Sequence, residues 1–127
     1  MTTTLNPILF HTTDWSAVPV TEHSGETGTA RWRTINFGKL RIRVVEYSVN
    51  YRANHWCKLG HILYCLEGEL TTELSDGRVF KLTKGMSYQV TDTISAHRSS
   101  SKEGVKMLII DGDFLRPGFI NFNPWKM

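Results

Sequence analysis

The amino-acid sequence predicts an all-β protein, either a β-sandwich or a β-barrel. Short segments rich in Val, Ile, Tyr, Phe and Thr alternate with Gly, Asp, Asn and Ser, which is the pattern of strands joined by turns. No stretch repeats apolar residues at helical spacing over three turns. The length of 127 residues suits a single domain with one core. Periodicity alone does not separate a sandwich from a barrel.

The expected elements follow in order along the chain. We expect an N-terminal strand or arm over residues 5–18, and a loop over residues 21–28, where two glycines lie among small polar residues. Asp76-Gly77 predicts a hairpin, because glycine readily adopts a positive φ. The tail 115–127 contains two prolines and is expected to form an irregular arm. The segments with strand character are 29–36, 40–49, 61–74, 79–82, 86–91 and 105–111.

The predicted strand 40–49 has a clear period of two. Leu40, Ile42 and Val44 share one face, which is therefore apolar. Arg41 and Arg43 fall on the other face. We expect them to be ordinary exposed charges, with anchors for an acidic ligand at a barrel mouth as the alternative.

Composition narrows the classes of partner. The net charge of +3 is mildly basic, and the fifteen Lys and Arg residues are scattered along the chain. This favours a small anionic molecule and argues against nucleic acid, which requires a clustered basic surface. The N-terminus lacks signal-peptide character and no segment has the length of a membrane span, so we expect a cytoplasmic protein. The two cysteines make no disulfide framework, and Cys65 is expected in the core.

Metal-binding side chains cluster at one point of the sequence. His55, Cys57 and His61 lie within seven residues, and His97 precedes a later strand or begins it. On a strand His55 and Cys57 face the same side, and a turn before His61 would let it converge with them. A thiolate at Cys57 would help to neutralise a divalent ion. The alternatives are a buried, unreactive Cys57, or a reactive thiolate beside His61 in a metal-free site.

The spacing of these residues resembles a known family. His55, Cys57, His61 and Gly68 match the intervals of the first cupin motif, which reads His-x-His, three or four residues, Glu, six residues, Gly. Gly85 and His97 resemble the second motif, and the likeness covers about residues 38–111. The segment 54–57 (Asn-His-Trp-Cys) is similar to that of the small "DHCW motif" cupins. Two residues depart from the first motif: Cys57 stands where His is usual, and His61 where Glu is usual.

The resemblance implies a fold, a metal and a class of function. It implies one cupin domain over residues 1–127, a double-stranded β-helix or jelly roll with N-terminal and C-terminal arms, and a homodimer. It implies a divalent transition metal bound by His55, Cys57, His61 and His97; the thiolate favours Zn, Fe(II) or Ni. The expected function is a metal-dependent small-molecule enzyme of oxygenase or isomerase type, with its reaction and catalytic residues unassigned. The alternative is a non-catalytic binding or sensing cupin, with a structural metal or none.

Overall fold

The computed structural model describes residues 7–116. Within these residues the regular structure consists of strands and two short 3₁₀ helices, and no helix has the length and apolar character needed to cross a membrane. The elements are η1 Trp15–Ala17, β1 Val20–Ser24, β2 Thr29–Phe37, β3 Leu40–Tyr47, β4 Tyr51–Arg52, β5 His61–Leu74, β6 Val79–Thr83, β7 Ser87–Val90, β8 His97–Ser101, β9 Val105–Asp111 and η2 Asp113–Leu115.

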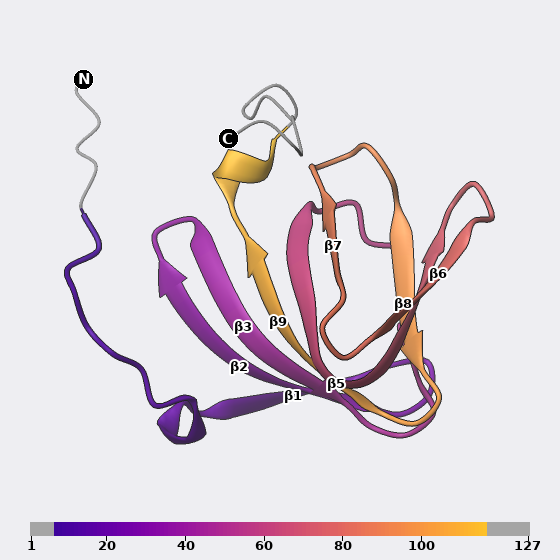
Figure 1. The fold of residues 1–127 in the computed structure, drawn as a ribbon, viewed down its shortest axis with the longest axis horizontal. Helices are drawn as coiled ribbons and strands as arrows, with labels where there is room; N and C mark the ends of the chain where they lie inside the picture. The colour runs from indigo at the N-terminus through magenta and orange to yellow at the C-terminus, as the bar shows by residue number, and fades with distance from the viewer. Residues whose placement is uncertain (1–6, 117–127) are drawn as a thin grey trace.

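The strands form a curled antiparallel sheet around the long strand β5 (Figure 1). The first half of β5 pairs with β9 and β7, and its second half pairs with β8 and β6. Beyond β9 the sheet continues through β3 and β2 to β1, and beyond β8 it ends at β4. One strand therefore joins the two walls that face each other across the interior, as in a β-barrel.

A bulge in β5 changes which residues point inward. The register with β9 shifts between Cys65 and Glu67, and Gly68 has a φ of 82°. A Cβ at this glycine would collide with the carbonyl oxygen of Gly104, so both the backbone angle and the space require glycine. Before the bulge the buried residues of β5 have odd numbers, and after it they are Leu70 and Thr72. The strand thereby keeps its apolar side chains inside while it bends from one wall to the other.

Most predicted strands and the predicted hairpin are confirmed. Within the turn between β5 and β6, the Gly77 N–H donates to the carbonyl of Leu74 at 3.0 Å. The Arg78 N–H donates to the Asp76 carboxylate at 3.0 Å. Gly77 has a φ of 95°, as the Asp-Gly signal requires. His97 proves to be the first residue of a strand, β8, where the sequence allowed either a loop or a strand start.

One of the two predictions for the N-terminal region is wrong, while the described part of segment 5–18, predicted as a strand or an arm, is an arm. The expected loop 21–28 begins with strand β1, which pairs with β2 from Val20↔Arg33 to Ser24↔Thr29. Its polar residues are exposed, because an edge strand is held by backbone hydrogen bonds and needs no apolar face. The described part of the segment 5–18 contains η1 in place of a strand, with the Asp14 side chain capping Ser16 N–H at 3.0 Å. Of the expected C-terminal arm, residues 117–127 lie outside the described residues.

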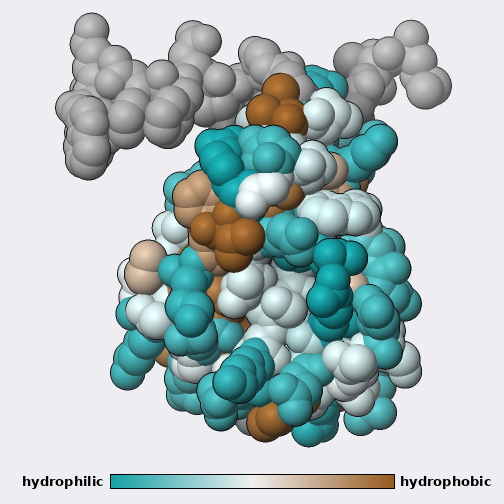
Figure 2. Space-filling model, turned by 90° about the vertical axis from the view of Figure 1, so that its right-hand side faces the viewer, coloured by the Kyte–Doolittle hydropathy of each residue, from teal (hydrophilic) through white to brown (hydrophobic). Residues whose placement is uncertain are grey.

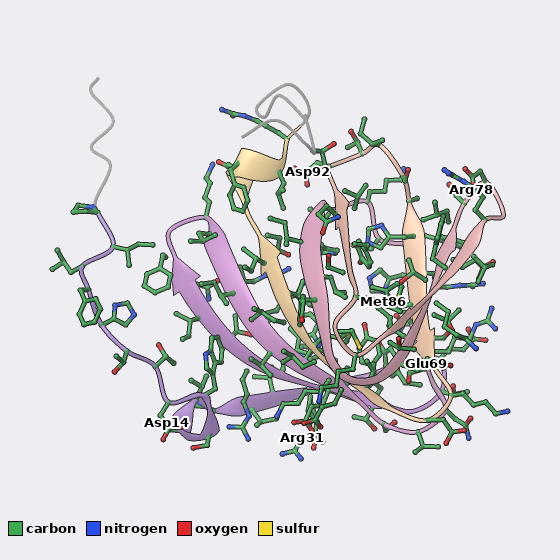
Figure 3. All side chains as sticks on the ribbon, in the orientation of Figure 1. Asp14, Arg31, Glu69, Arg78, Met86 and Asp92 are labelled. Carbon is green, nitrogen blue, oxygen red and sulfur yellow. The ribbon has the colours of Figure 1, made fainter. Side chains whose placement is uncertain are left out.

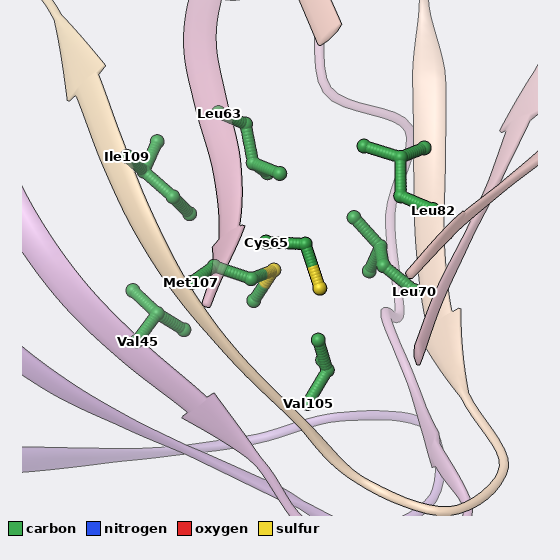
Figure 4. Close-up of a cluster of buried hydrophobic side chains, with 8 residues drawn as sticks. All are labelled: Val45, Leu63, Cys65, Leu70, Leu82, Val105, Met107 and Ile109. Atoms are coloured by element: carbon green, nitrogen blue, oxygen red, sulfur yellow. The ribbon is translucent and has the colours of Figure 1, made fainter. Parts of the chain in front are cut away.

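The core consists of cross-strand rows of inward side chains (Figure 4). At its centre Val45 of β3 and Cys65 of β5 both pair with Met107 of β9, and all three are at most 1% exposed. Cys65 is thus a core residue, as predicted. By contrast, the face at the β6 and β8 side of the molecule is mainly hydrophilic (Figure 2), although Val79 and Phe80 of β6 are exposed.

The prediction that Arg41 and Arg43 are exposed charges is wrong. Arg43 is only 5% exposed, and both side chains line the interior on the same face of β3 as Val45. The opposite face carries Val44, which is also buried, and this face lies beside the N-terminal segment around Trp15. Because both faces of β3 are covered, the apolar alternation in the sequence did not show which face of the strand points into the barrel.

Candidate metal centre

The structure brings Cys57, His61 and His97 together at one end of the interior. One potential ligand atom from each lies within 4.8 Å of the others. Cys57 and His97 form an antiparallel bridge, in which each N–H donates to the other's carbonyl at 2.8 and 3.0 Å. His61 is the first residue of β5, and its Nε2 lies 3.5 Å from Cys57 Sγ. Residues forty positions apart in the chain thus converge through sheet pairing.

A close backbone approach fixes the segment that carries Cys57. The Gly60 N–H donates to the Asp92 carboxylate at 2.6 Å, and a Cβ at Gly60 would lie 2.6 Å from the Val90 carbonyl oxygen. The Asp92 N–H in turn donates to the Leu115 carbonyl at 2.8 Å. Figure 3 shows Asp92 at this end of the molecule and Glu69 toward the other. Only glycine fits here, so the turn before His61 is held against the end of β7.

Asp111 supports His61 from behind. Its Oδ2 lies 3.3 Å from His61 Nδ1, although the ring is not aligned for a hydrogen bond. Arg41 donates two hydrogen bonds to the same carboxylate, at 3.0 and 2.7 Å, and Arg43 donates one at 3.2 Å. A carboxylate behind a histidine is the usual arrangement around metal-binding imidazoles, because it fixes the ring orientation.

Sheet register explains this arrangement. Asp111 of β9 pairs with Arg41 of β3. On its other side β9 pairs with β5 through Ile110↔Ile62, and the next position along these antiparallel strands sets Asp111 opposite His61. Side chains that occupy one cross-strand row on one face are direct neighbours. The row therefore reads His61, Asp111, Arg41.

The local charges shift the pKa values of these groups. Burial raises the pKa of Asp111, but contacts with His61 and Arg41 and the nearby guanidinium charges outweigh it and hold that pKa well below its ordinary value. Burial lowers the pKa of His61, yet Asp111 and Cys57 raise it overall. Burial raises the pKa of the Cys57 thiol, whereas the His61 contact and the Leu59 backbone lower it overall. These groups favour a thiolate at Cys57, the form that binds metal.

His97 offers a buried nitrogen without a partner. Its Nδ1 lies 3.0 Å from the carbonyl oxygen of Ser95, so Nδ1 carries the proton and Nε2 carries the lone pair. Nε2 is buried and has no hydrogen-bond partner among the described residues. A buried acceptor without a partner is unfavourable, and a metal ion would satisfy it. Two imidazoles and one thiolate fit zinc, iron(II) or nickel.

The structure leaves His55 outside this group. Its side chain is exposed, and its Nδ1 lies 2.9 Å from Asn54 Oδ1, although the residue lines the same cavity as the three donors. Residues 54–56 bend and belong to no strand, so the expectation that His55 and Cys57 share a strand face does not apply. Its role as a ligand stays a prediction.

The donors open into a cavity of about 270 Å³ in the barrel interior. No Asp or Glu is among its described lining residues, whereas Arg41 and Arg43 both are. The guanidinium carbon of Arg43 lies 4.4 Å from the centre of the Trp32 ring. Burial lowers the pKa of Arg43, and the charge of Arg41 lowers it further. A second cavity of about 230 Å³ shares Tyr88 and His97 with the first.

Sequence analysis missed Asp111 and the inward position of Arg43. Asp111 ends an apolar stretch, and sequence analysis did not consider it as a site residue. A signal was present, because Asp111 shares the two-residue period of Met107 and Ile109 and so faces inward with them. A charged residue in phase with a buried face of a strand is a candidate for a site.

Comparisons with known proteins give matches in structure alone. No protein-family model and no curated protein matches the chain. An RmlC-like cupin from Shewanella frigidimarina has a TM-score of 0.65 and 18% identity, and the match covers 88% of this chain and 97% of that one. Ectoine synthase from P. lautus has a TM-score of 0.64 and 18% identity, with coverage of 81% and 78%. Fe(II)-HppE with an alternative substrate has a TM-score of 0.66 and 13% identity, with coverage of 80% and 60%.

These neighbours agree on the architecture. Solved cupins align with 64% and 88% of this chain, with TM-scores of 0.53 and 0.65. The identities are low, so the comparison concerns the fold. The chain has the fold of the cupin superfamily.

Proposed function

We propose that the protein is a metal-binding cupin that acts on a small molecule at a divalent transition metal held by Cys57, His61 and His97. The observation that supports this best is the buried lone pair of His97 Nε2, which belongs to a group with Cys57 and His61 whose potential ligand atoms lie within 4.8 Å. Zinc, iron(II) or nickel suits this donor set. Such an ion, when bound, supplies Lewis acidity, or redox chemistry where it is iron.

The surrounding residues prepare the donors for this role. The Asp111 carboxylate lies beside His61 Nδ1, and the Ser95 carbonyl holds the proton of His97 on Nδ1, which directs the lone pair of His97 to its Nε2. Leu63 and Ile109 provide apolar walls to the cavity. Three protein donors leave a place for a ligand from the cavity, which is the composition of a catalytic zinc site, whereas structural sites have four.

The structural neighbours support a metal-dependent enzyme. HppE was solved with Fe(II) and an alternative substrate, and another neighbour is ectoine synthase. We carry over to this chain only the class of metal-dependent enzyme; the oxygenase or isomerase type is what the motif resemblance implies. His55 on the cavity wall is the predicted fourth ligand, and whether it binds the metal decides how many coordination positions remain for a substrate.

A non-catalytic binding or sensing role is the second candidate. The observation that favours it is the absence of Asp and Glu among the described residues that line the donor cavity, so no carboxylate there is available as a general base. The homodimer also stays a prediction. The apolar side chains of Ile8, Leu9 and Phe10, which are 53%, 75% and 96% exposed, support it.

Metal analysis tests the proposal. The protein is purified without chelator, and its metal content is measured for the unaltered chain and for Cys57→Ser, His61→Gln, His97→Gln and His55→Gln. We expect about one ion per chain, and its loss in the first three variants, because each removes a ligand. The exposed His11→Gln is the matched control and should keep the ion. A chain that binds no transition metal, or that keeps full stoichiometry in all three variants, contradicts the proposal.

Spectroscopy then separates the two candidate functions. In cobalt-substituted protein, an open coordination position responds to added small anions with a changed visible spectrum, whereas a closed tetrahedral site does not. A response supports the enzyme. A tetrahedral spectrum that ignores anions favours the binding or sensing role.

A further inference from the structure

We infer that the ligand of the donor cavity is a small oxyanion, such as a carboxylate or a phosphate, and that Arg43 anchors it. The inference deepens the proposed function, on which it rests for the neighbouring metal, by naming the chemical class of the ligand. The guanidinium of Arg43 is buried, whereas the sequence predicted an exposed charge.

Arg43 occupies a position that would ordinarily hold an apolar residue. It pairs with Ile109 of β9, which pairs with Leu63 of β5, so its neighbours on that side of the cross-strand row are apolar. The residue is only 5% exposed. Its guanidinium stacks on Trp32 at 4.4 Å, which holds the planar group in one orientation within the cavity wall. A fixed, buried cation of this kind is unfavourable unless something compensates for it.

The compensation within the described residues is incomplete. Arg43 shares the single carboxylate of Asp111 with Arg41, which takes the shorter bonds at 2.7 and 3.0 Å, while Arg43 has one at 3.2 Å. The Nε of Arg43 is buried and has no hydrogen-bond partner in the described part of the chain. Two guanidinium charges therefore face one carboxylate charge. The Cys57 thiolate adds a second negative charge, and a divalent ion bound to it would leave a net positive charge around the cavity.

The cavity has the properties that an anionic ligand requires. Its described lining holds no Asp or Glu, and a bound metal would neutralise the charge of the Cys57 thiolate, which also lines it. The guanidinium fork matches the oxygens of a carboxylate or a phosphate. The volume of about 270 Å³ lies at the small end of ligand sites, and the apolar Leu63 and Ile109 would contact a short carbon skeleton. A small metabolite that carries an oxyanion group fits this description.

A binding measurement on the whole chain tests the inference. Isothermal titration calorimetry is carried out with succinate, with inorganic phosphate, and with the neutral succinamide as the uncharged comparison. Both the metal-loaded and the metal-free protein are titrated. We expect an oxyanion to bind about ten- to a hundredfold more tightly than succinamide in both forms, because the diamide cannot accept a charge-assisted bond in the same way. The stronger of succinate and phosphate identifies the oxyanion.

Variants assign the binding to Arg43. We expect Arg43→Gln to weaken anion binding about ten- to a hundredfold, and Arg43→Lys to restore part of it, since it returns the charge without the fork. Arg31→Gln is the matched control, because Arg31 is an exposed arginine on the neighbouring strand β2, and it should bind as the unaltered protein does. Circular dichroism checks that each variant is folded.

The outcomes separate this inference from the proposed function. Equal binding of succinate, phosphate and succinamide by the unaltered protein overturns the inference, and this comparison needs no variant if Arg43→Gln does not fold. Anion binding that is unchanged in folded Arg43→Gln overturns it as well. A protein that binds succinate through Arg43 but takes up no metal supports the inference while refuting the metal. A metal-loaded protein that binds no anion leaves the metal and refutes the inference.

Discussion

Replacement of Asp111 by asparagine removes the one negative charge that several cations share. The carboxylate contacts Arg41, Arg43 and His61, at distances between 2.7 and 3.3 Å. The side chains of Asp111, Arg43 and His61 are all at most 8% exposed, while that of Arg41 is 30% exposed. Asparagine has nearly the same shape, so the substitution changes the charge and leaves the packing.

The magnitude follows from burial. Breaking a buried ion pair by removing one partner typically costs about 3–5 kcal/mol, because the remaining charge is left uncompensated. The amide oxygen of the substituted side chain would still accept a bond from Arg41, and the partial exposure of Arg41 lets water screen its charge. We therefore expect the free energy of unfolding to fall by about 2–3 kcal/mol at neutral pH, below the typical range.

The effect should depend on pH in a defined direction. The pKa of Asp111 is held well below its ordinary value of 3.8 in the folded protein. A group with a lowered folded pKa stabilises the fold fully above its unfolded pKa and loses that contribution as the pH falls toward the folded value. The difference in stability between the unaltered chain and Asp111→Asn should therefore shrink below about pH 4. It should also shrink as the pH rises above 6.5, the ordinary pKa of histidine, because Asp111 helps to raise the pKa of His61 and the charged ring is then lost.

Urea denaturation of the metal-free proteins between about pH 3 and pH 7 measures both quantities. Asp113→Asn is the matched control, because Asp113 lies two residues further on and its ion pair with Lys39 is 58% and 81% exposed. Such a surface pair contributes about 0–1 kcal/mol. A loss of less than about 1 kcal/mol for Asp111→Asn, equal to that of the control, would refute the assignment of Asp111 as the shared counter-charge. A difference that does not shrink in acid would do so too.

Three further predictions follow from the site and the barrel. Asp111→Asn should weaken metal binding about 10- to 100-fold in a competition titration, since His61 loses its orienting carboxylate; unchanged affinity would remove Asp111 from this role. Iodoacetamide should label Cys57 in the metal-free protein and leave the buried Cys65 unlabelled, and bound metal should protect Cys57. Peptide mass spectrometry measures the labelling of each cysteine, and equal labelling of Cys57 and Cys65 would contradict the prediction. Gly68→Ala should lower the free energy of unfolding by at least about 1–3 kcal/mol, because its φ is 82° and the added Cβ would collide with Gly104. In the control Gly38→Ala the added Cβ meets no atom within 4 Å, so this variant bears only the backbone strain and should lose less stability. Equal losses in the two variants would contradict the role of the close contact.

The sequence predicts those parts of the fold that depend on local signals. The Asp76-Gly77 hairpin and the long strand 61–74 follow from turn chemistry and alternation, and the structure has both. Strand β1 could not be found in this way. Its residues Val20–Ser24 are mostly polar and exposed, and they are held at the sheet edge by pairing with β2, which is a long-range interaction.

In the candidate site, too, local contacts could be predicted from the sequence and contacts made by long-range strand pairing could not. The spacing of Cys57 and His61 is local, so the sequence could indicate that these two lie close together. His97 needed the second motif as a guide, because the bridge that brings it to Cys57 joins residues forty positions apart. Asp111 could not be placed beside His61 from the sequence, since their contact depends on the register between β5 and β9. A different register would have placed another residue there.

The register also explains why one cavity can hold both a metal group and an anion anchor. His61 and Asp111 lie in one cross-strand row, and the next row inward contains Leu63, Ile109 and Arg43. Because inward residues on a strand are two positions apart, Arg43 lies one layer deeper than Arg41, on the same face of β3. A ligand bound between the rows would contact the metal group at one end and Arg43 at the other. One shift of β3 by a single residue would turn both arginines outward, so the fold and the chemistry are specified by the same strand pairing.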